Sequence, residues 1–324
     1  MAEQGAPPSA CCGPPTAEEG RRPEAHPAIV VPSGAVKRPD RLITVPSGRT
    51  HTGTGRPLLP IDGEAPVREH KVAAFAIDPF TVTNSWFAEF VAATGYVTEA
   101  ERFGWSFVFH LLVADPAAPA QAVVGATWWR KIEGANWRAP EGRGASIEGR
   151  ESHPVVHVSL NDARSFAQWA EGRLPTEIEW EHAARGGLAG DPRYPWGDQE
   201  PDDDDFMPCN IWQGRFPDHN TAADGYLGTC PVDAFAPNGY GVFNMCGNVW
   251  EWTSQPMRIR STKKQLRLAD ADAVKRGLHL TKGGSFLCHK SYCHRYRIAA
   301  RTGNTADSST SHIGFRLVYD LPPA

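Results

Sequence analysis

Hydrophobic residues recur at helical spacing in two segments of the chain, and residues that start or stop helices flank both segments. The first predicted helix follows Thr83 or Asn84 as its N-cap and ends at Gly95. The second follows Ser159 and ends before Gly172. Their apolar stripes are Trp86, Phe87, Phe90 and Val91 in the first and Ala163, Phe166, Ala167 and Ala170 in the second. Both segments are therefore predicted to be helices that cover a core with one face.

A third helix has the clearest boundaries, because Thr176 and Glu179 have the spacing of a capping box and Gly186 follows the apolar positions. The other patterned segments are short runs typical of strands, at 67–78, 154–159 and 313–318. Long loops rich in Gly, Pro, Asn and Asp separate these elements. The pattern predicts an α+β fold with little regular secondary structure.

The composition agrees with a loop-rich fold, since the chain has 31 Gly and 28 Pro together with 11 Trp that can anchor a core. Residues 1–40 have almost no aromatic content and are predicted to be a disordered tail. Cys11 and Cys12 in this tail are either a redox or metal-handling pair or two incidental thiols. Residues 41–320 are expected to form one domain, followed by a short tail at 321–324.

The charge pattern excludes some classes of protein. A formal net charge of −4 and a pI near 6.3 argue against a general nucleic-acid or membrane-surface binder. No apolar run approaches the roughly 20 residues that span a bilayer, and the first residues lack the features of a secretory signal. We therefore expect a cytoplasmic protein with reduced thiols, and the odd count of seven Cys also fits poorly with a disulfide framework. The chain has no nucleophile elbow, Walker loop, zincin motif or dinucleotide fingerprint.

Two cysteines near the C-terminus, in "GGSFLCHKSYCHRYR" (283–297), have an unusual spacing. In a strand, Cys288 and Cys293 would lie on opposite faces, and in a helix they would lie about 140° apart. Only a turn between them, within 289–292, brings both sulfurs to one point. The pair could then form a disulfide or a two-thiolate metal site, which best suits Cu(I), whereas four-cysteine zinc is disfavoured. Two unrelated cysteines are the alternative interpretation.

The neighbours of the pair are basic. Lys290, Arg295 and Arg297, with His289 and His294, are expected to raise the local potential and to stabilise thiolates.

Two polar loops are candidates for cation binding. The loop 209–226 carries Asn210, Asp218, Asn220 and Asp224, which could wrap Ca²⁺, although a polar surface loop is the simpler interpretation. The segment 238–252 carries oxygen donors among glycines, and it is either a second cation site or a tight turn packed by its tryptophans; these donors are Asn244, Asn248 and Glu251. From the residues alone, the turn is the better interpretation.

Two charged segments remain. The acidic run 202–205 is interpreted as a solvated loop. The basic stretch 255–277 is interpreted as a variable surface loop, although it could also dock a substrate chain.

The segments "RLPTEIEWEHAARGG", "YPWGD", "NIWQGRFP", "PNGYGVFNMCGNVWEWTS", "KGGSFLCHKSYCHRYRIAAR" and "IGFRL" occur in this order. Together they resemble the formylglycine-generating enzymes, or sulfatase-modifying factors, from about residue 42 to 320. The W-E-W and G-F-R motifs mark only the wider superfamily, whereas the cysteine-pair segment is specific to its oxidases. The resemblance implies a single compact α+β domain of the C-type-lectin-related kind, typically stapled by calcium.

The resemblance also implies an activity. It implies a copper-dependent oxidase that uses O₂ and reductant to convert a cysteine in a C-x-P-x-R sulfatase motif into Cα-formylglycine, thereby activating sulfatases. The expected partner is an unfolded or nascent sulfatase chain, with no nucleic acid and no membrane, and a monomer is expected. The alternative is a non-catalytic lectin-like binding module, as in superfamily members that lack the cysteines.

Site residues follow from the resemblance position by position. Cys288 and Cys293 match the copper ligands, and a disulfide between them is the expected alternative when metal is absent. Ser285, Trp250 and Tyr292 match further active-site residues. The first calcium site corresponds to Asn210, Ile211, Asp224 and Tyr226, and the second to Asn244, Gly247, Val249 and Glu251. His312 stands where the family often has Asn.

Overall fold

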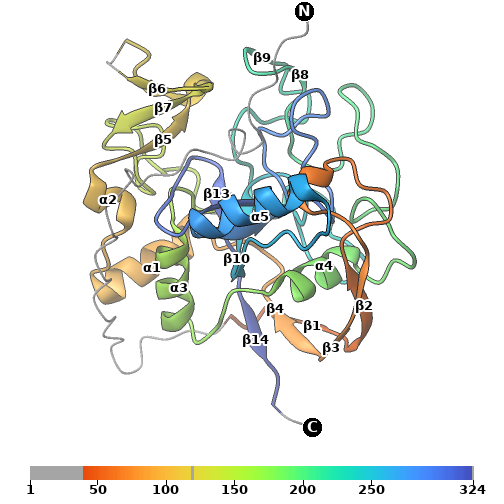
Figure 1. Cartoon of the computed structure of the whole chain (residues 1–324). Coiled ribbons are helices and arrows are strands. Elements are labelled where there is room, and N and C mark those ends of the chain that lie inside the picture. The colour runs from red at the N-terminus through yellow and green to blue at the C-terminus, as the bar shows by residue number, and fades with distance from the viewer. Residues whose placement is uncertain (1–38, 118–119, 323–324) are drawn as a thin grey trace, which may run out of the picture.

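The computed structural model describes residues 39–117 and 120–322. The proposed tail, including Cys11 and Cys12, lies outside the described residues except for its last two positions. The helices are α1 (Asn84–Thr94), α2 (Glu99–Phe103), α3 (Leu160–Trp169), α4 (Glu177–Arg185) and α5 (Lys264–Lys275), with 3-10 turns at η2 (Pro60–Asp62) and η3 (His110–Leu112). In Figure 1 the helices surround short strands, and long stretches of irregular chain connect them. The α+β fold with little regular structure is confirmed.

Within the described residues, the strands form five small sheets. One joins β1 (Ile43–Val45), β4 (Phe75–Ile77) and β14 (Val318–Asp320), and a four-stranded sheet has the order β12 (Thr302–Thr305), β11 (Leu278–Lys282), β10 (Trp250–Pro256), β13 (Ile313–Gly314). The others are β2 (Gly48–Thr52) with β3 (Arg68–Val72), β5 (Trp105–Phe109) with β7 (Ala126–Glu133) and β6 (Gln121–Val123), and β8 (Gly214–Arg215) with β9 (His219–Asn220). The β5–β7–β6 sheet lies to one side of the main body (Figure 1).

All three predicted helices are present with the predicted N-caps. The hydroxyl oxygens of Thr83, Ser159 and Thr176 accept hydrogen bonds from the N–H groups that open α1, α3 and α4. Thr176 and Glu179 form the predicted reciprocal capping box, and Gly186 ends α4 with a φ of 58°. These boundaries depend on residues three positions apart, which explains why the sequence predicts them.

The strand predictions succeed only in part. The run 67–78 divides into β3 and β4, which belong to different sheets. The predicted strand 154–159 is wrong, because His157 has a φ of 58° and only Pro154 forms an isolated bridge, to Thr83. The run 313–318 contributes only its ends to strands. Part of the basic stretch 255–277 is not a loop but the helix α5.

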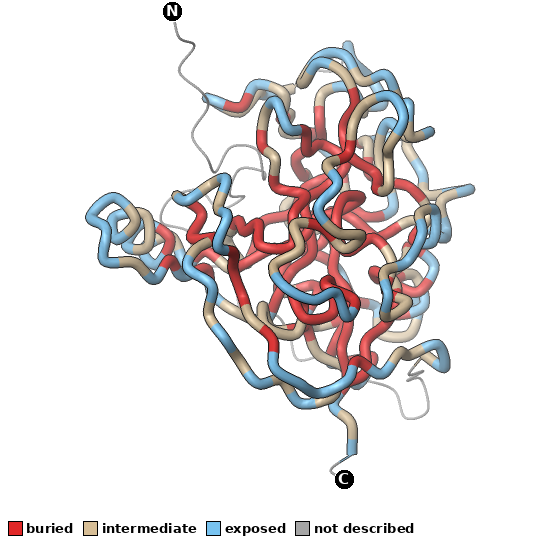
Figure 2. The backbone as a smooth tube through the Cα atoms, turned by 90° about the vertical axis from the view of Figure 1, so that its right-hand side faces the viewer, coloured by how far each residue is buried: buried red, intermediate tan, exposed pale blue. Residues whose placement is uncertain are grey.

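Aromatic side chains fill the core, as the composition predicts. Figure 2 shows a continuous buried interior beneath exposed outer loops. Seven tryptophans are essentially inaccessible to solvent: Trp129, Trp137, Trp169, Trp180, Trp212, Trp250 and Trp252. The largest apolar cluster contains both Cys288 and Cys293, so the fold itself removes the cysteine pair from bulk water.

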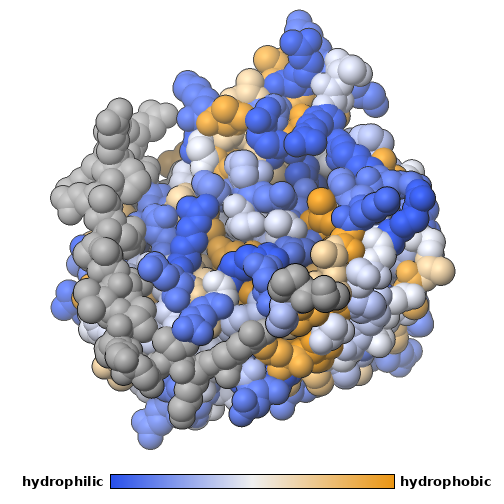
Figure 3. All heavy atoms as spheres, turned by 90° about the horizontal axis from the view of Figure 1, so that it is seen from below, coloured by the Kyte–Doolittle hydropathy of each residue, from blue (hydrophilic) through white to orange (hydrophobic). Residues whose placement is uncertain are grey.

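Among the described residues, no helix has the length and apolar character needed to cross a bilayer. The face seen from below carries hydrophilic residues with smaller groups of hydrophobic residues between them (Figure 3).

Candidate active site

Cys288 and Cys293 lie at the two ends of one tight turn, as their spacing predicts. The carbonyl of His289 accepts hydrogen bonds from the N–H groups of Tyr292 and Cys293, both at 3.0 Å. The two cysteines are 2% and 3% exposed and belong to one apolar cluster. The turn therefore brings two soft sulfur donors into one dry environment, which suits Cu(I).

Ser285 supports the start of this turn. Its carbonyl accepts the N–H of Cys288 at 2.9 Å, and its hydroxyl accepts the N–H of Leu287 at 3.3 Å. Trp250 at the start of β10 lies in the same apolar cluster as both cysteines. The backbone N–H of Trp250 donates to the backbone carbonyl of His312 at 2.9 Å. Ser285 is thus buried at the start of the cysteine turn, and Trp250 is buried in the apolar cluster that contains both cysteines.

Tyr292 joins an aromatic group beside the cysteine turn. Its ring stacks on Phe216, with centroids 4.2 Å apart, and meets the edge of Trp128 at 5.1 Å. All three side chains are only partly buried. The group combines β7, the β8–β9 hairpin and the cysteine turn, and it forms a partly accessible apolar surface next to the buried sulfurs.

His312 packs among other aromatic rings. Its ring is fully buried, 4.7 Å from Trp129 and 6.5 Å from Phe286 between centroids. Its Nδ1 is 2.6 Å from the hydroxyl of Thr310.

The arginines that follow the pair do not act as free cations, which corrects the expectation from sequence. The guanidinium of Arg295 donates to both carboxylate oxygens of Asp62, at 2.7 and 3.2 Å. Arg297 donates in the same way to Glu64. Each pair is buried and joins residues 233 positions apart. These charges are compensated by carboxylates that no sequence spacing reveals.

The two histidines also contact carboxylates. His289 Nε2 lies 3.2 Å from Asp203, and His294 Nε2 lies 3.3 Å from Glu200. Burial, with Arg297 nearby, lowers the pKa of His294 to about 4, so this ring is neutral at pH 7. Asp203 belongs to the acidic run interpreted above as a solvated loop, and its contact with the cysteine turn was missed because it depends on tertiary folding.

The loop of the first predicted calcium site brings several of its oxygens together. The amide nitrogen of Asn210 donates to the Gly228 carbonyl at 2.9 Å, and its buried Oδ1 accepts no hydrogen bond in the described chain. The Gln213 amide nitrogen contacts both the Ile211 carbonyl and Asp224 Oδ2. The two oxygens therefore lie within reach of one small group. Buried and unsatisfied amide oxygens with nearby carbonyl and carboxylate oxygens fit a hard cation such as Ca²⁺. The fourth predicted residue, Tyr226, is partly buried, and its N–H donates to Asp224 at 3.0 Å.

The second loop shows the same feature. The Asn244 amide nitrogen donates to the Val232 carbonyl at 2.8 Å, which leaves its buried Oδ1 without a hydrogen bond in the described residues. Gly247 and Val249 follow in the same tight, buried segment, where Asn244 and Gly247 have φ values of 49° and 81°. Glu251 Oε1 accepts one hydrogen bond, so a lone pair of this oxygen could still serve a cation. This donor set also fits calcium.

Three other buried cysteines lie in or between these loops: Cys209, Cys230 and Cys246. Burial raises the pKa of the Cys209 and Cys246 thiols, and it raises the pKa of Cys230 to about 12. These thiols are protonated at neutral pH and are poor metal ligands. Within the described chain, no group of three or more His, Cys, Asp or Glu side chains could hold a metal ion, so a metal here would need the two-sulfur or oxygen-rich sets described above.

Known proteins share this sequence over nearly its full length. The sulfatase-modifying factor enzyme 1-like domain model matches residues 28–321. The chain is 53% identical over 289 residues to the formylglycine-generating enzyme of Thermomonospora curvata, which covers 86% of this chain and 93% of that protein. It is 46% identical over 308 residues to the formylglycine-generating enzyme of Bos taurus, and the match covers 93% of this chain and 80% of that protein. It is also 45% identical over 282 residues to a Bos taurus protein named inactive C-alpha-formylglycine-generating enzyme 2, covering 85% and 86%.

A solved structure gives the fold independently. PvdO from Pseudomonas aeruginosa superposes with a TM-score of 0.59 at 22% identity, over 86% of this chain and 94% of that one. Together with the buried cysteine turn, this defines a compact α+β protein of the lectin-related class with little regular structure. The chain belongs to the sulfatase-modifying factor family, the family of the formylglycine-generating enzymes.

Proposed function

We propose that this protein is a formylglycine-generating enzyme, which activates sulfatases by oxidising one of their cysteines to Cα-formylglycine. The observation that carries the proposal is the buried turn that joins Cys288 and Cys293 in one apolar cluster. Similarity alone would not suffice, because relatives with and without the word "inactive" in their names match at similar identity. The proposal therefore depends on the two cysteines.

The overall reaction balances with one O₂ and one two-electron reductant. The peptidyl –CH₂–SH group, O₂ and two hydrogen atoms from a reductant give –CHO, H₂S and H₂O. The substrate loses one Cβ–S bond and one Cβ–H bond and gains one Cβ=O bond. We assign Cu(I), held by Cys288 and Cys293, as the cofactor, because it supplies one-electron chemistry with O₂ and prefers soft sulfur ligands.

The chain's own residues exclude water and orient the reactants. The apolar cluster around Trp250 keeps the two sulfurs dry, and Ser285 holds the backbone at the start of their turn. Tyr292 and the rings stacked on it offer an apolar surface beside the turn for the substrate peptide. Ca²⁺ at the second loop would hold the chain that enters β10 in place, because Glu251 of that site belongs to this strand, and Ca²⁺ at the first loop would fix the segment 210–226.

The proposed substrate is an unfolded or nascent sulfatase segment with a C-x-P-x-R motif. A motif of this kind must enter the site as an extended chain, which a folded sulfatase would not offer. We also propose that the protein is a cytoplasmic monomer that acts without nucleic acid or membrane.

The test uses a peptide that contains C-x-P-x-R, incubated with Cu(I)-loaded protein, O₂ and a thiol reductant. We expect the peptide to lose about 18 Da, and the product to react with a hydrazine as an aldehyde does. A peptide with Ala in place of Cys controls for unrelated chemistry, and the Cys288→Ser variant controls for contaminating activity.

A non-catalytic binding module is the second candidate, and the "inactive" relatives favour keeping it in view. It predicts peptide binding without any mass change. Binding at micromolar peptide with no loss of mass from the copper-loaded protein would therefore replace the enzymatic assignment with this one.

A further inference from the structure

A cavity of about 180 Å³ lies between the β2–β3 hairpin, the start of α4 and the segment that follows β10. It is separate from the residues assigned to the cysteine and calcium sites. Its lining is unusually basic and comprises Thr52, Arg68, His70, Glu177, Ile178, Gln255, Pro256, Arg258, Arg260 and Arg301. Four arginines thus face one small space with a single carboxylate.

Two of these arginines are already neutralised. Arg301 forms an ion pair with Glu177, at 2.6 Å, and its Nη1 donates to backbone carbonyls. Arg258 donates to both carboxylate oxygens of Asp270 on α5, each at 3.0 Å. These pairs leave no net charge.

The other two arginines are not compensated. Within the described chain, neither Arg68 nor Arg260 forms an ion pair, and Arg68 Nη2 donates only to the backbone carbonyl of Arg260, at 3.1 Å. Burial and repulsion from Arg301 lower the pKa of Arg68, and the more distant Glu177 and Glu181 only partly oppose this. The wall of the cavity therefore carries two guanidinium groups, part-buried Arg68 and exposed Arg260, that no carboxylate pairs directly, and both would attract an anion that enters the cavity.

Neutral donors complete the lining. The Gln255 side-chain oxygen accepts the N–H of Glu177 at 3.2 Å, which leaves the Gln255 amide nitrogen able to donate elsewhere. His70 Nε2 lies 2.9 Å from the Thr52 hydroxyl, so this imidazole is also held at the wall of the cavity. Fork-shaped guanidinium donors with amide donors are the usual partners of oxyanions.

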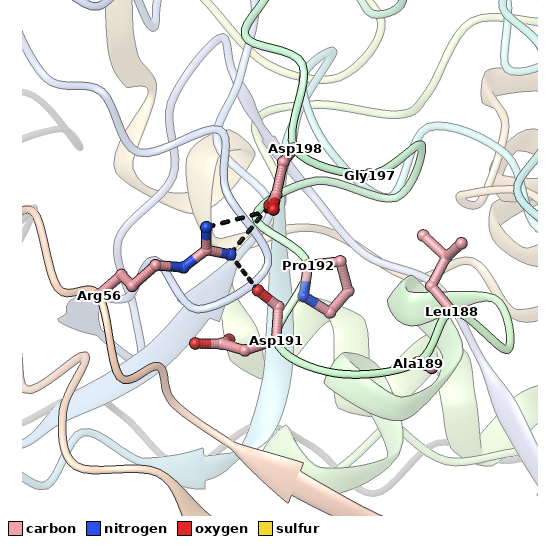
Figure 4. A pocket seen from close by; sticks show the side chains of 7 residues that line it. All are labelled: Arg56, Leu188, Ala189, Asp191, Pro192, Gly197 and Asp198. Atoms are coloured by element: carbon pink, nitrogen blue, oxygen red, sulfur yellow. Dashed lines mark hydrogen bonds and ion pairs between the residues drawn. The ribbon is translucent and has the colours of Figure 1, made fainter.

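We propose that this cavity binds a tetrahedral dianion, which is either free phosphate or sulfate or the phosphate group of a monoester. Two unbalanced guanidinium groups match two negative charges, and the volume suits a group of this size. The nearby open cavity of about 350 Å³ beside Arg56 offers the contrast. There the Arg56 guanidinium points at Asp198 and contacts both of its carboxylate oxygens, so its charge is balanced (Figure 4).

The test is calorimetric titration of the full chain with inorganic phosphate, inorganic sulfate and O-phosphoserine, at constant ionic strength set with chloride. We expect saturable binding and a rise in melting temperature that follows ligand concentration. Preference for the free ions over O-phosphoserine would assign the source as a free ion, and the reverse order would assign an ester.

Arg68→Gln and Arg260→Gln are each expected to weaken binding at least about tenfold, because each removes a charge-assisted donor. Arg56→Gln is the matched control and should bind the anion as the parent does. If Arg68→Gln fails to fold, Arg260→Glu still tests the positive charge of the cavity. Arg260 is exposed, so its replacement should leave the fold intact. Absence of saturable binding at millimolar anion, or equal binding by the parent and the Arg260→Glu variant, would overturn the proposal.

Discussion

Glu251 and Arg316 form a buried, two-point ion pair that joins the W-E-W and G-F-R motifs. Arg316 Nη2 donates to Oε1 at 2.6 Å and Nε donates to Oε2 at 2.7 Å, and neither side chain is more than 1% exposed. Trp180 Nε1 on α4 donates to the same carboxylate at 2.8 Å. Three distant segments therefore meet at the carboxylate of Glu251, which is also a residue of the proposed second calcium site.

Arg316→Met should destabilise the protein strongly, because it leaves the Glu251 carboxylate buried without its cation. We expect the free energy of unfolding to fall by about 3–5 kcal/mol. Urea denaturation at one fixed calcium concentration measures this. Arg49→Gln, which breaks the exposed pair with Glu69, is the control and should cost at most ~1 kcal/mol. A cost for Arg316→Met as small as that of the control would contradict the role of the buried pair.

Cys288→Ser and Cys293→Ser should each abolish tight Cu(I) binding, because one thiolate cannot provide a two-sulfur site. Competition with a chromophoric Cu(I) chelator measures the affinity. Cys246→Ala removes a buried thiol outside the turn and should leave the affinity unchanged. Retention of the parent affinity by either serine variant would rule out the two-thiolate site.

Calcium removal should lower the melting temperature, because the buried oxygens of Asn210 and Asn244 then lose their ligand. At a concentration of 100 times Kd, calcium would stabilise the fold by about 2.7 kcal/mol per site. Asn244→Gly keeps the left-handed backbone but removes the side-chain oxygen, and it should reduce the calcium-dependent shift. Asp218→Ala alters an exposed carboxylate of the first loop that belongs to neither proposed ligand set, and it should keep the full shift. Equal shifts in both variants would remove Asn244 from the site.

His157 should make the protein sensitive to acid. Burial lowers its pKa to about 3, while Nε2 donates to the Pro140 carbonyl and Nδ1 accepts from the Ser106 hydroxyl, each at 2.8 Å. The unfolded state, with a histidine pKa near 6.5, binds more protons between about pH 3 and 6.5, so stability should fall as pH decreases through this window.

His157→Asn tests this assignment, because Asn tolerates the left-handed backbone at this position and does not titrate there. Denaturant unfolding at several pH values should give a shallower slope for the variant between about pH 4 and 6.5. A variant that loses stability on acidification as steeply as the parent would show that other groups are responsible.

Several features of the site could be predicted because they depend on neighbouring residues. The cysteine turn follows from the separation of five positions, because neither a strand nor a helix would place both side chains on the same side. The roles of the two polar loops were different. From residue types alone, the simplest interpretation of the first loop was a polar surface loop, and that of the second was a tight turn. Only the family resemblance indicated calcium sites. In the described chain, the buried oxygens of Asn210 and Asn244 accept no hydrogen bond, which fits the proposed ligand sets.

The sequence by itself determined the caps and ends of α1, α3 and α4, the turn between Cys288 and Cys293 and the family of the chain. All of these depend on local hydrogen bonding or on ordered motifs. Only the tertiary structure decided that Arg295 and Arg297 are neutralised by Asp62 and Glu64, and that Arg68 and Arg260 are not neutralised. Charge balance depends on which side chains meet after folding, and these partners lie up to 233 positions apart along the chain.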